Sequence, residues 1–207
     1  MMKHYGTPNT RSTRVAWALE EAGAEYEFIP VQLAKGEHKQ PAFLAINPGG
    51  KIPALVDGDL VLTESAAICT YIGDKFPQSG LVPPVTDSAN RALYLQWCFF
   101  AMTELEPPLW AIARHSRLYP KERQVPAVVE TCKWEFERAA DVLTQHLQEQ
   151  DYALDRGFSA ADIILARVLN WAQGEGFTLN ATLESYLKRM LARPAVARAN
   201  AKESQGL

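Results

Sequence analysis

The sequence lacks the features that mark several large protein classes. Its 21 Lys and Arg residues are balanced by 24 Asp and Glu residues, for a formal net charge of −3, so it has no positive excess to suit nucleic acid or an anionic membrane surface. No stretch approaches the roughly 20 apolar residues that cross a bilayer, and the opening MMKHYGTPN lacks the apolar core of a signal peptide. We therefore expect a cytoplasmic protein with neither a nucleic-acid nor a membrane partner.

Cysteine is also scarce. Cys69, Cys98 and Cys132 are odd in number, widely spaced and set within apolar helical patterns. This usage argues against a disulfide framework or a zinc site. We expect three buried free thiols and no metal.

The first 29 residues predict a strand, a helix and a second strand. Residues 3–5 form a short strand candidate, and from Val15 the apolar residues recur at helical spacing until Gly23, a natural helix stop. Residues 26–29 alternate as a second strand should. A crossover of this length predicts parallel strands with a right-handed connection.

The most informative segment is residues 47–68, NPGGKIPALVDGDLVLTESAAI. Pro53 precedes the strand-like residues 54–56, where a proline belongs at an edge, a strand start or a turn. An Ile52-Pro53 bond can be cis at little cost, and a cis bond would turn the polar backbone groups of Ile52 outward. Asp57-Gly58 then predicts an antiparallel hairpin.

A helix over residues 65–76 follows the hairpin. Ser65 is a candidate N-cap, and the free backbone N–H groups at such a helix start favour an anion. Glu64, just outside the helix, is placed to meet an ammonium group. A ligand with an α-amino acid end and a peptide-like middle would suit both Ile52 and this helix start.

These elements predict a thioredoxin-like α/β domain with a mixed four-stranded sheet, followed by an all-α domain. Residues 77–87, PQSGLVPPVTD, are rich in proline and read as a linker. We expect domains over residues 1–78 and 88–207, joined by residues 79–87. In the second domain, apolar periodicity predicts helices over 90–110, broken or kinked at Pro107-Pro108, and over 128–147, with further helices capped by Ser159 and Asn180.

Pro53 after NPGGKI, together with Glu64-Ser65, resembles the glutathione-binding signature of the glutathione S-transferase superfamily, in particular bacterial members of theta, nu or beta type. The resemblance covers essentially the whole chain and includes the capping motif of Ser159 and Asp162. It implies a homodimeric enzyme that adds the glutathione thiolate to small hydrophobic electrophiles, with glutathione as a substrate. Ile52 and Pro53 would meet its cysteinyl segment, and Glu64 and Ser65 its γ-glutamyl end.

The group that activates the thiol should lie in the loop after the first strand, residues 6–13. The resemblance ranks Thr10 first, since Thr10 precedes Arg11 as the activating serine precedes arginine in many bacterial members. Asn9 and then Tyr5 are the alternatives, and Ser12 is interpreted as a helix cap.

The remaining expected contacts are also what the resemblance implies. Lys51 is a candidate for the glycyl carboxylate of glutathione, as are His38, Lys35 and Lys39 of the preceding polar loop, and of these Lys51 and His38 are chosen. The electrophile is expected between the domains, against Trp110, Arg114 and His115, the last two beyond the double proline.

Two rival functions share this scaffold, because fold does not decide function. One is a glutathione-dependent disulfide reductase or peroxidase, in which the reactive thiols belong to the ligand. The other is a non-catalytic glutathione-binding or regulatory module. Turnover of a small disulfide but not of chlorodinitrobenzene would favour the first. Loss of the residues that bind glutathione would favour the second.

Overall fold

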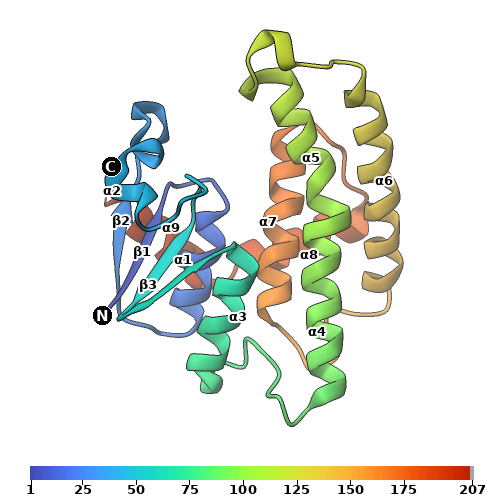
Figure 1. The fold of residues 1–207 in the computed structure, drawn as a ribbon. Coiled ribbons are helices and arrows are strands. Elements are labelled where there is room, and N and C mark those ends of the chain that lie inside the picture. Colours follow the sequence, from blue (N-terminus) through green and yellow to red (C-terminus); the bar gives the residue numbers. More distant parts are fainter. Residues whose placement is uncertain (206–207) are drawn as a thin grey trace. The chain divides into compact units, whose positions relative to one another are not determined.

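The computed structural model describes residues 1–205 (Figure 1). Its contacts divide the chain into two compact units, Met1–Asp87 with the segment from Leu191 onward, and Ser88–Met190. The predicted domain boundaries, 1–78, 79–87 and 88–207, stay a prediction, and this division differs from them in grouping the last segment with the first unit. In the described part of the chain, no helix is long and apolar enough to cross a membrane.

The first unit is built on a mixed sheet of four strands in the order β2-β1-β3-β4. β1 pairs in parallel with β2, and β3 pairs antiparallel with both β1 and β4. The thioredoxin-like sheet expected from the sequence is thereby confirmed. The strands are β1 (Met2–Gly6), β2 (Tyr26–Pro30), β3 (Ala54–Asp57) and β4 (Leu60–Thr63).

Helices cover both faces of this sheet. α1, α3 and α9 contact strands β1, β3 and β2 on the face where Met2 and His4 are buried. On the opposite face, Tyr5 meets Phe43 of α2 edge to face, with ring centroids 6.3 Å apart. The bounds are α1 (Ser12–Glu21), α2 (Pro41–Leu44), α3 (Ser65–Lys75) and α9 (Pro194–Ser204), with 3-10 turns η1 (Leu33–Lys35), η2 (Glu37–Lys39) and η3 (Pro77–Ser79).

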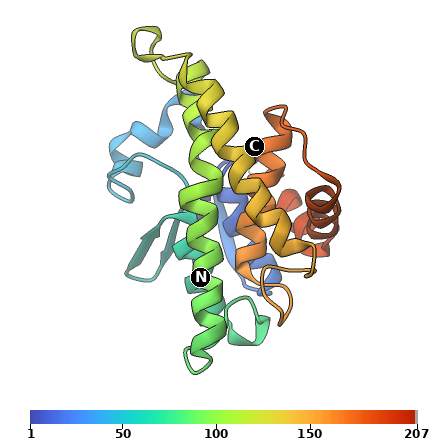
Figure 2. The same ribbon diagram turned by 90° about the vertical axis from the view of Figure 1, so that its right-hand side faces the viewer.

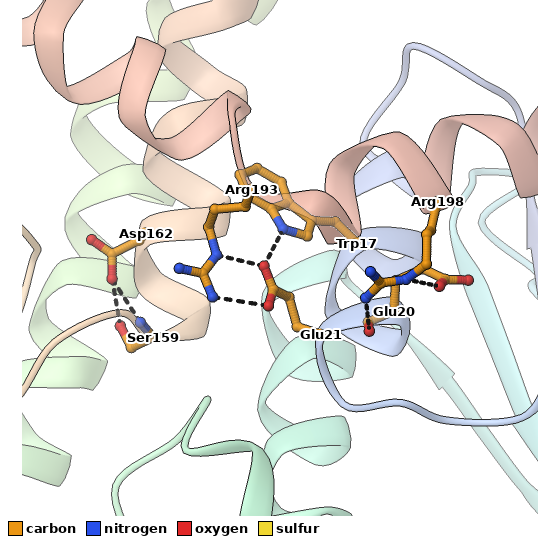
Figure 3. Close-up of polar contacts among 7 residues, drawn as sticks. All are labelled: Trp17, Glu20, Glu21, Ser159, Asp162, Arg193 and Arg198. Carbon is orange, nitrogen blue, oxygen red and sulfur yellow. Dashed lines mark hydrogen bonds and ion pairs between the residues drawn. The ribbon is translucent and has the colours of Figure 1, made fainter.

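Polar contacts fasten α9 to α1 (Figure 3). Arg193 donates to both carboxylate oxygens of Glu21, at 2.6 and 2.9 Å, and the indole of Trp17 donates to Glu21 at 2.9 Å. Arg198 donates to the carboxylate and the carbonyl of Glu20, at 3.0 and 2.9 Å. The end of the described chain is therefore part of the sheet-bearing unit.

The second unit is helical, as expected. In Figure 2 a long rod made of α4, η4 and α5 runs beside α6, which contacts both η4 and α5. The elements are α4 (Ser88–Phe100), the π-helical turns η4 (Ala101–Leu105) and η5 (Arg114–Leu118) on either side of α5 (Glu106–Ala113), the 3-10 turn η6 (Lys121–Arg123), α6 (Val128–Leu147), α7 (Ala160–Gly174) and α8 (Ala181–Leu191).

The double proline does not end the predicted helix: the backbone stays helical from α4 into α5, and the irregularity is a π-helical turn just before the prolines. The α-helical hydrogen bonding changes to a π-helical turn over Ala101–Leu105, and Pro107 and Pro108 then lie in the first turn of α5. Proline is tolerated there because the first N–H groups of a helix have no partner within it. The helix also continues past the predicted end at Trp110, to Ala113.

The predicted caps of the later helices are confirmed. The buried carboxylate of Asp162 accepts hydrogen bonds from the backbone N–H and the hydroxyl of Ser159, at 2.8 and 3.0 Å (Figure 3). The side-chain oxygen of Asn180 accepts from the N–H of Leu183 at 3.1 Å. The three cysteines are free and buried, and burial raises the pKa of the Cys98 thiol to about 12, so that thiol stays protonated and unreactive.

Candidate functional site

A compact cluster of hydroxyl groups fills the loop between β1 and α1. Thr10 Oγ1 donates to the carbonyl oxygen of Thr7 at 2.7 Å and lies 2.7 Å from Ser12 Oγ. Ser12 Oγ donates to the same carbonyl at 2.5 Å and accepts from the Thr7 N–H at 2.8 Å. The loop therefore holds Thr10 through two partners, one of which is another hydroxyl.

Ser12 is not the helix cap that the sequence predicts. α1 begins at Ser12 itself, and Arg11 occupies the N-cap position. The Ser12 hydroxyl bonds back to Thr7, five residues earlier, instead of to the N–H groups of the helix's first turn. The reason is the tight turn over residues 7–11, which brings the Thr7 peptide within reach of Ser12.

The three candidates for thiol activation occupy different environments. Thr10 is half-buried, whereas Asn9 is exposed and has a left-handed backbone, with φ 58°. Tyr5 packs its ring against Phe43 of α2. Asparagine tolerates the left-handed region better than most residues, so the turn itself explains Asn9.

The loop that leads into β3 is braced by Asn47. Its side-chain nitrogen donates to the carbonyl of Lys51 at 2.6 Å, and its side-chain oxygen accepts from the N–H of Gly49 at 2.9 Å. The Ile52-Pro53 bond is cis, as the sequence allows. Pairing with β1 and β4 begins only at Ala54, which leaves the backbone of Ile52 outside those ladders.

Glu64 and Ser65 form the start of α3. Glu64 is exposed and lies at the N-cap position with φ 66° and ψ 111°, and Ser65 is the first helical residue, so the prediction of Ser65 as N-cap is wrong by one residue. A non-glycine residue with positive φ is held there at a cost of about 1–3 kcal/mol, which is typical of functional sites. The Ser65 hydroxyl is buried and accepts a hydrogen bond from the guanidinium of Arg14 at 3.1 Å.

His38 lies next to the loop that carries Lys51. A Cβ atom built on Gly50, whose φ is +58°, would be 3.1 Å from the His38 carbonyl oxygen. His38 is half-buried and Lys51 is exposed. The structure thus brings together the η2 turn and the segment before Pro53, the two regions expected to serve the glycyl end.

In the second unit, the predicted electrophile contacts form one cluster. The Arg114 guanidinium lies 5.8 Å from the ring centre of Trp110 and 5.7 Å from that of Tyr119, whose hydroxyl it also approaches at 3.3 Å. The His115 ring meets Tyr119 edge to face at 5.3 Å, and its Nδ1 accepts from the Val125 N–H at 3.2 Å. These contacts hold Arg114 and His115 against Tyr119.

Sequence reasoning missed two residues that organise the site. Arg14, 1% exposed, supports Ser65 from another element, and the available signal was an arginine directly before the apolar run that starts at Val15. Asn47 braces the residue 47–51 loop, and Asn-Pro-Gly-Gly is a recognisable turn sequence. Among residues 1–205, no group of three or more His, Cys, Asp or Glu side chains is placed to hold a metal ion.

Comparisons with known proteins agree with this geometry. Residues 1–74 match the family described as glutathione S-transferase, N-terminal domain. The chain is 37% identical over 166 residues to glutathione S-transferase 3 of Zea mays, covering 78% of this chain and 73% of that protein. The chain belongs to the glutathione S-transferase family. The relatives confirm the function expected from the sequence, that of a glutathione transferase.

Two further relatives match the transferase over nearly its full length. The disulfide-bond oxidoreductase YfcG of Escherichia coli is 30% identical over 215 residues, covering 100% of this chain and 97% of that protein. The solved structure of a glutathione S-transferase from Xylella fastidiosa superimposes with a TM-score of 0.87 at 28% identity, covering 99% of both chains. The fold of both units is therefore that of the family.

Proposed function

We propose that this transferase binds glutathione on its first unit and activates the thiol through Thr10. The observation that carries the proposal is the half-buried Thr10 hydroxyl, held 2.7 Å from both Thr7 O and Ser12 Oγ at the start of α1. A hydroxyl in this position can turn its proton to a thiolate, and the N-terminus of α1 favours the same negative charge.

The grip on glutathione uses the three regions described above. The backbone of Ile52, next to Pro53, meets the cysteinyl segment, and Glu64 receives the α-ammonium group. The α-carboxylate lies at the start of α3, where Ser65 is supported by the buried cation Arg14. Lys51 and His38 serve the glycyl carboxylate. The second substrate is a small hydrophobic electrophile that contacts Trp110, Arg114 and His115.

The stabilisation that thiol activation requires gives an estimate of how much the pKa of the bound thiol should change when the Thr10 hydroxyl is removed. A thiol with a pKa near 8.5 needs roughly 2.7 kcal/mol of preferential thiolate stabilisation to ionise near pH 6.5. One hydrogen bond to a charged group supplies about 1.5–3 kcal/mol. Loss of the Thr10 hydroxyl should therefore raise the pKa of the bound thiol by about one to two units.

The test is a thiolate-absorbance titration of glutathione bound to the parent protein, Thr10→Ala and Thr10→Ser. The parent and Thr10→Ser, which keeps a hydroxyl, should show the lowered thiol pKa, and Thr10→Ala should not. A lowered pKa that persists in Thr10→Ala would move the role to Asn9, to Tyr5 or to the helix terminus. Absence of any shift in the parent would favour a non-catalytic binding module.

A second candidate function is glutathione-dependent disulfide reduction, of the kind found among bacterial members of the family with Thr or Asn in the loop after the first strand. It is favoured by the relation to YfcG across 97% of that protein and by a loop over residues 6–13 that contains no cysteine, so any reactive thiol belongs to the ligand. Turnover of hydroxyethyl disulfide without turnover of chlorodinitrobenzene would select it over transfer.

We also propose that the transferase is a cytoplasmic homodimer. Three free, buried thiols suit a reducing compartment. The surface of α4 offers apolar side chains to a second copy: Leu95 and Phe99, four residues apart, are 36% and 64% exposed, and large exposed apolar residues on one helix face suit an interface. Light scattering of the purified chain measures the oligomeric state directly.

A further inference from the structure

Ser12 is buried in a space that a glycine provides. Its side chain is fully shielded, at 0% exposure, and a Cβ atom built on Gly6 would lie 2.5 Å from Ser12 Cβ and 2.7 Å from Ser12 Oγ. Any larger residue at position 6 would displace Ser12. The loop is thus shaped to hold the Ser12 hydroxyl close to the end of β1.

This hydroxyl is linked to the activating group by two contacts. Ser12 Oγ lies 2.7 Å from Thr10 Oγ1, and the Ser12 N–H donates to the same oxygen at 3.2 Å. Thr10 has one proton to donate and two lone pairs to fill. The Ser12 N–H fills one of these lone pairs, and the single proton of the Ser12 hydroxyl is given either to Thr10 Oγ1 or to the Thr7 carbonyl.

Both hydroxyls compete for one carbonyl oxygen. Thr7 O accepts from Ser12 Oγ at 2.5 Å and from Thr10 Oγ1 at 2.7 Å. When Ser12 donates to this carbonyl, Thr10 can turn its proton away without leaving the half-buried Thr7 C=O unpaired. Without Ser12, that carbonyl would hold the Thr10 proton, because a buried polar group deprived of its partner is unfavourable.

We propose that Ser12 is a positioning residue for thiol activation: its hydroxyl donates to the Thr7 carbonyl and its backbone N–H donates to Thr10 Oγ1, so that the Thr10 proton is free for the sulfur of glutathione. The proposal rests on the function proposed for Thr10. No covalent bond of the protein changes; the glutathione thiol loses its proton to solvent, and the Thr10 hydroxyl donates a hydrogen bond to the thiolate.

The test measures the pKa of bound glutathione by thiolate absorbance in Ser12→Ala. This substitution removes the hydroxyl but keeps the Ser12 N–H contact, so we expect the pKa to rise by about one unit, less than in Thr10→Ala. The affinity for S-methylglutathione, which has no ionisable thiol, should stay within about threefold of the parent. In Thr10→Ala/Ser12→Ala, the pKa should equal that of Thr10→Ala alone, because Ser12 acts through Thr10.

The matched control is Thr13→Ala. Thr13 is the next residue, is 2% exposed, and donates its hydroxyl to Glu203 at 2.8 Å, away from Thr10. Thr13→Ala should lower the thermal midpoint yet leave the thiol pKa unchanged. If Ser12→Ala does not fold, Ser12→Cys, whose S–H is a weaker donor, should show the same rise under reducing conditions.

The outcomes separate the two proposals. A thiol pKa that rises in Thr10→Ala but not in the Ser12 variants overturns the role of Ser12 and leaves that of Thr10 intact. A pKa unmoved in Thr10→Ala overturns the role of Thr10, and that of Ser12 with it. If the thiol pKa rises as much in Thr13→Ala as in Ser12→Ala, the Ser12 effect comes from a general destabilisation of α1. That result would also overturn the role of Ser12.

Discussion

His4 is a titratable group enclosed in the apolar side of the sheet. It is 0% exposed, and its ring packs against Tyr26 and Phe28 at centroid distances of 6.3 and 5.4 Å. Within the described residues, neither ring nitrogen has a hydrogen-bond partner. Burial therefore lowers the pKa of His4 to about 3 from 6.5, because the charged imidazolium cannot be solvated there.

This burial predicts a loss of stability in mild acid. As pH falls below 6.5 the unfolded chain binds the His4 proton while the folded chain does not, so the free energy of unfolding falls until pH reaches about 3. Between pH 7 and pH 5 the loss from this one group is about 2 kcal/mol. Urea unfolding at both pH values should show a difference smaller by that amount in His4→Leu than in the parent. Equal differences in the two proteins would contradict the prediction.

The sequence allowed the residues of the candidate site to be chosen, but it did not show which other residues they bond to. Pro53, Glu64 and Ser65 could be found because each sits beside a strand or helix boundary that the local sequence marks. The role of Ser12 could not, because its partner Thr7 depends on how the turn over residues 7–11 folds. Arg14 was missed for the same reason, since its partner Ser65 lies 51 residues away.

At the scale of elements, α3 depends on a glycine where the connection to the second unit crosses it. Leu81 and Val82 are buried, at 1% and 5% exposure. A Cβ atom on Gly73 would lie 2.9 Å from Val82 Cβ and 3.2 Å from Leu81 Cβ, and closer still to Val82 Cγ2. The connecting segment is therefore packed onto α3 at this point.

Gly73→Ala should destabilise the protein, although alanine favours a helix by about 1 kcal/mol over glycine. Overpacking costs about 1–3 kcal/mol, so we expect a net loss of about 1 kcal/mol in urea unfolding. The control is Gly174→Ala in α7, where a Cβ would meet nothing within 4 Å; it should be neutral or stabilising. Similar effects at both positions would show that the Val82 contact does not decide the outcome.

Local patterns located most elements but not the irregular turns between them. The bounds of α6, Val128–Leu147, agree with the apolar periodicity, and Asp57-Gly58 placed the hairpin because this dipeptide suits the turn, where Gly58 has φ 60°. The π-helical turns at Ala101–Leu105 and Arg114–Leu118 were not predicted. Pro107-Pro108 indicated an irregularity next to the first of these turns, but the local sequence does not distinguish a π-helical turn from a break or a kink.

At the scale of the whole molecule, α9 returns to the first unit although the sequence places it after the second. The Arg193–Glu21 pair is partly shielded, with the two side chains 30% and 13% exposed. Arg193→Gln should lower the free energy of unfolding by about 1–2 kcal/mol, since it removes a bidentate charged hydrogen bond. Urea unfolding measures the change.

Arg198→Gln is the matched comparison on the same helix. Arg198 also pairs with a glutamate of α1, but it is 54% exposed, and exposed pairs contribute only about 0–1 kcal/mol. The smaller loss should therefore be found at Arg198. The reverse order would mean that solvent exposure does not set the strength of these contacts.

Because α9 packs on the first unit, the unit that is translated first is the last to gain all of its contacts. A ribosome makes β1, α1 and the loop carrying Thr10 first, but Glu20 and Glu21 meet Arg198 and Arg193 only after the whole of the second unit has been translated. Domains generally fold as units during synthesis. Here the unit translated first must wait for the segment after residue 190, so a nonsense codon late in the gene would damage the part of the enzyme that was made earliest.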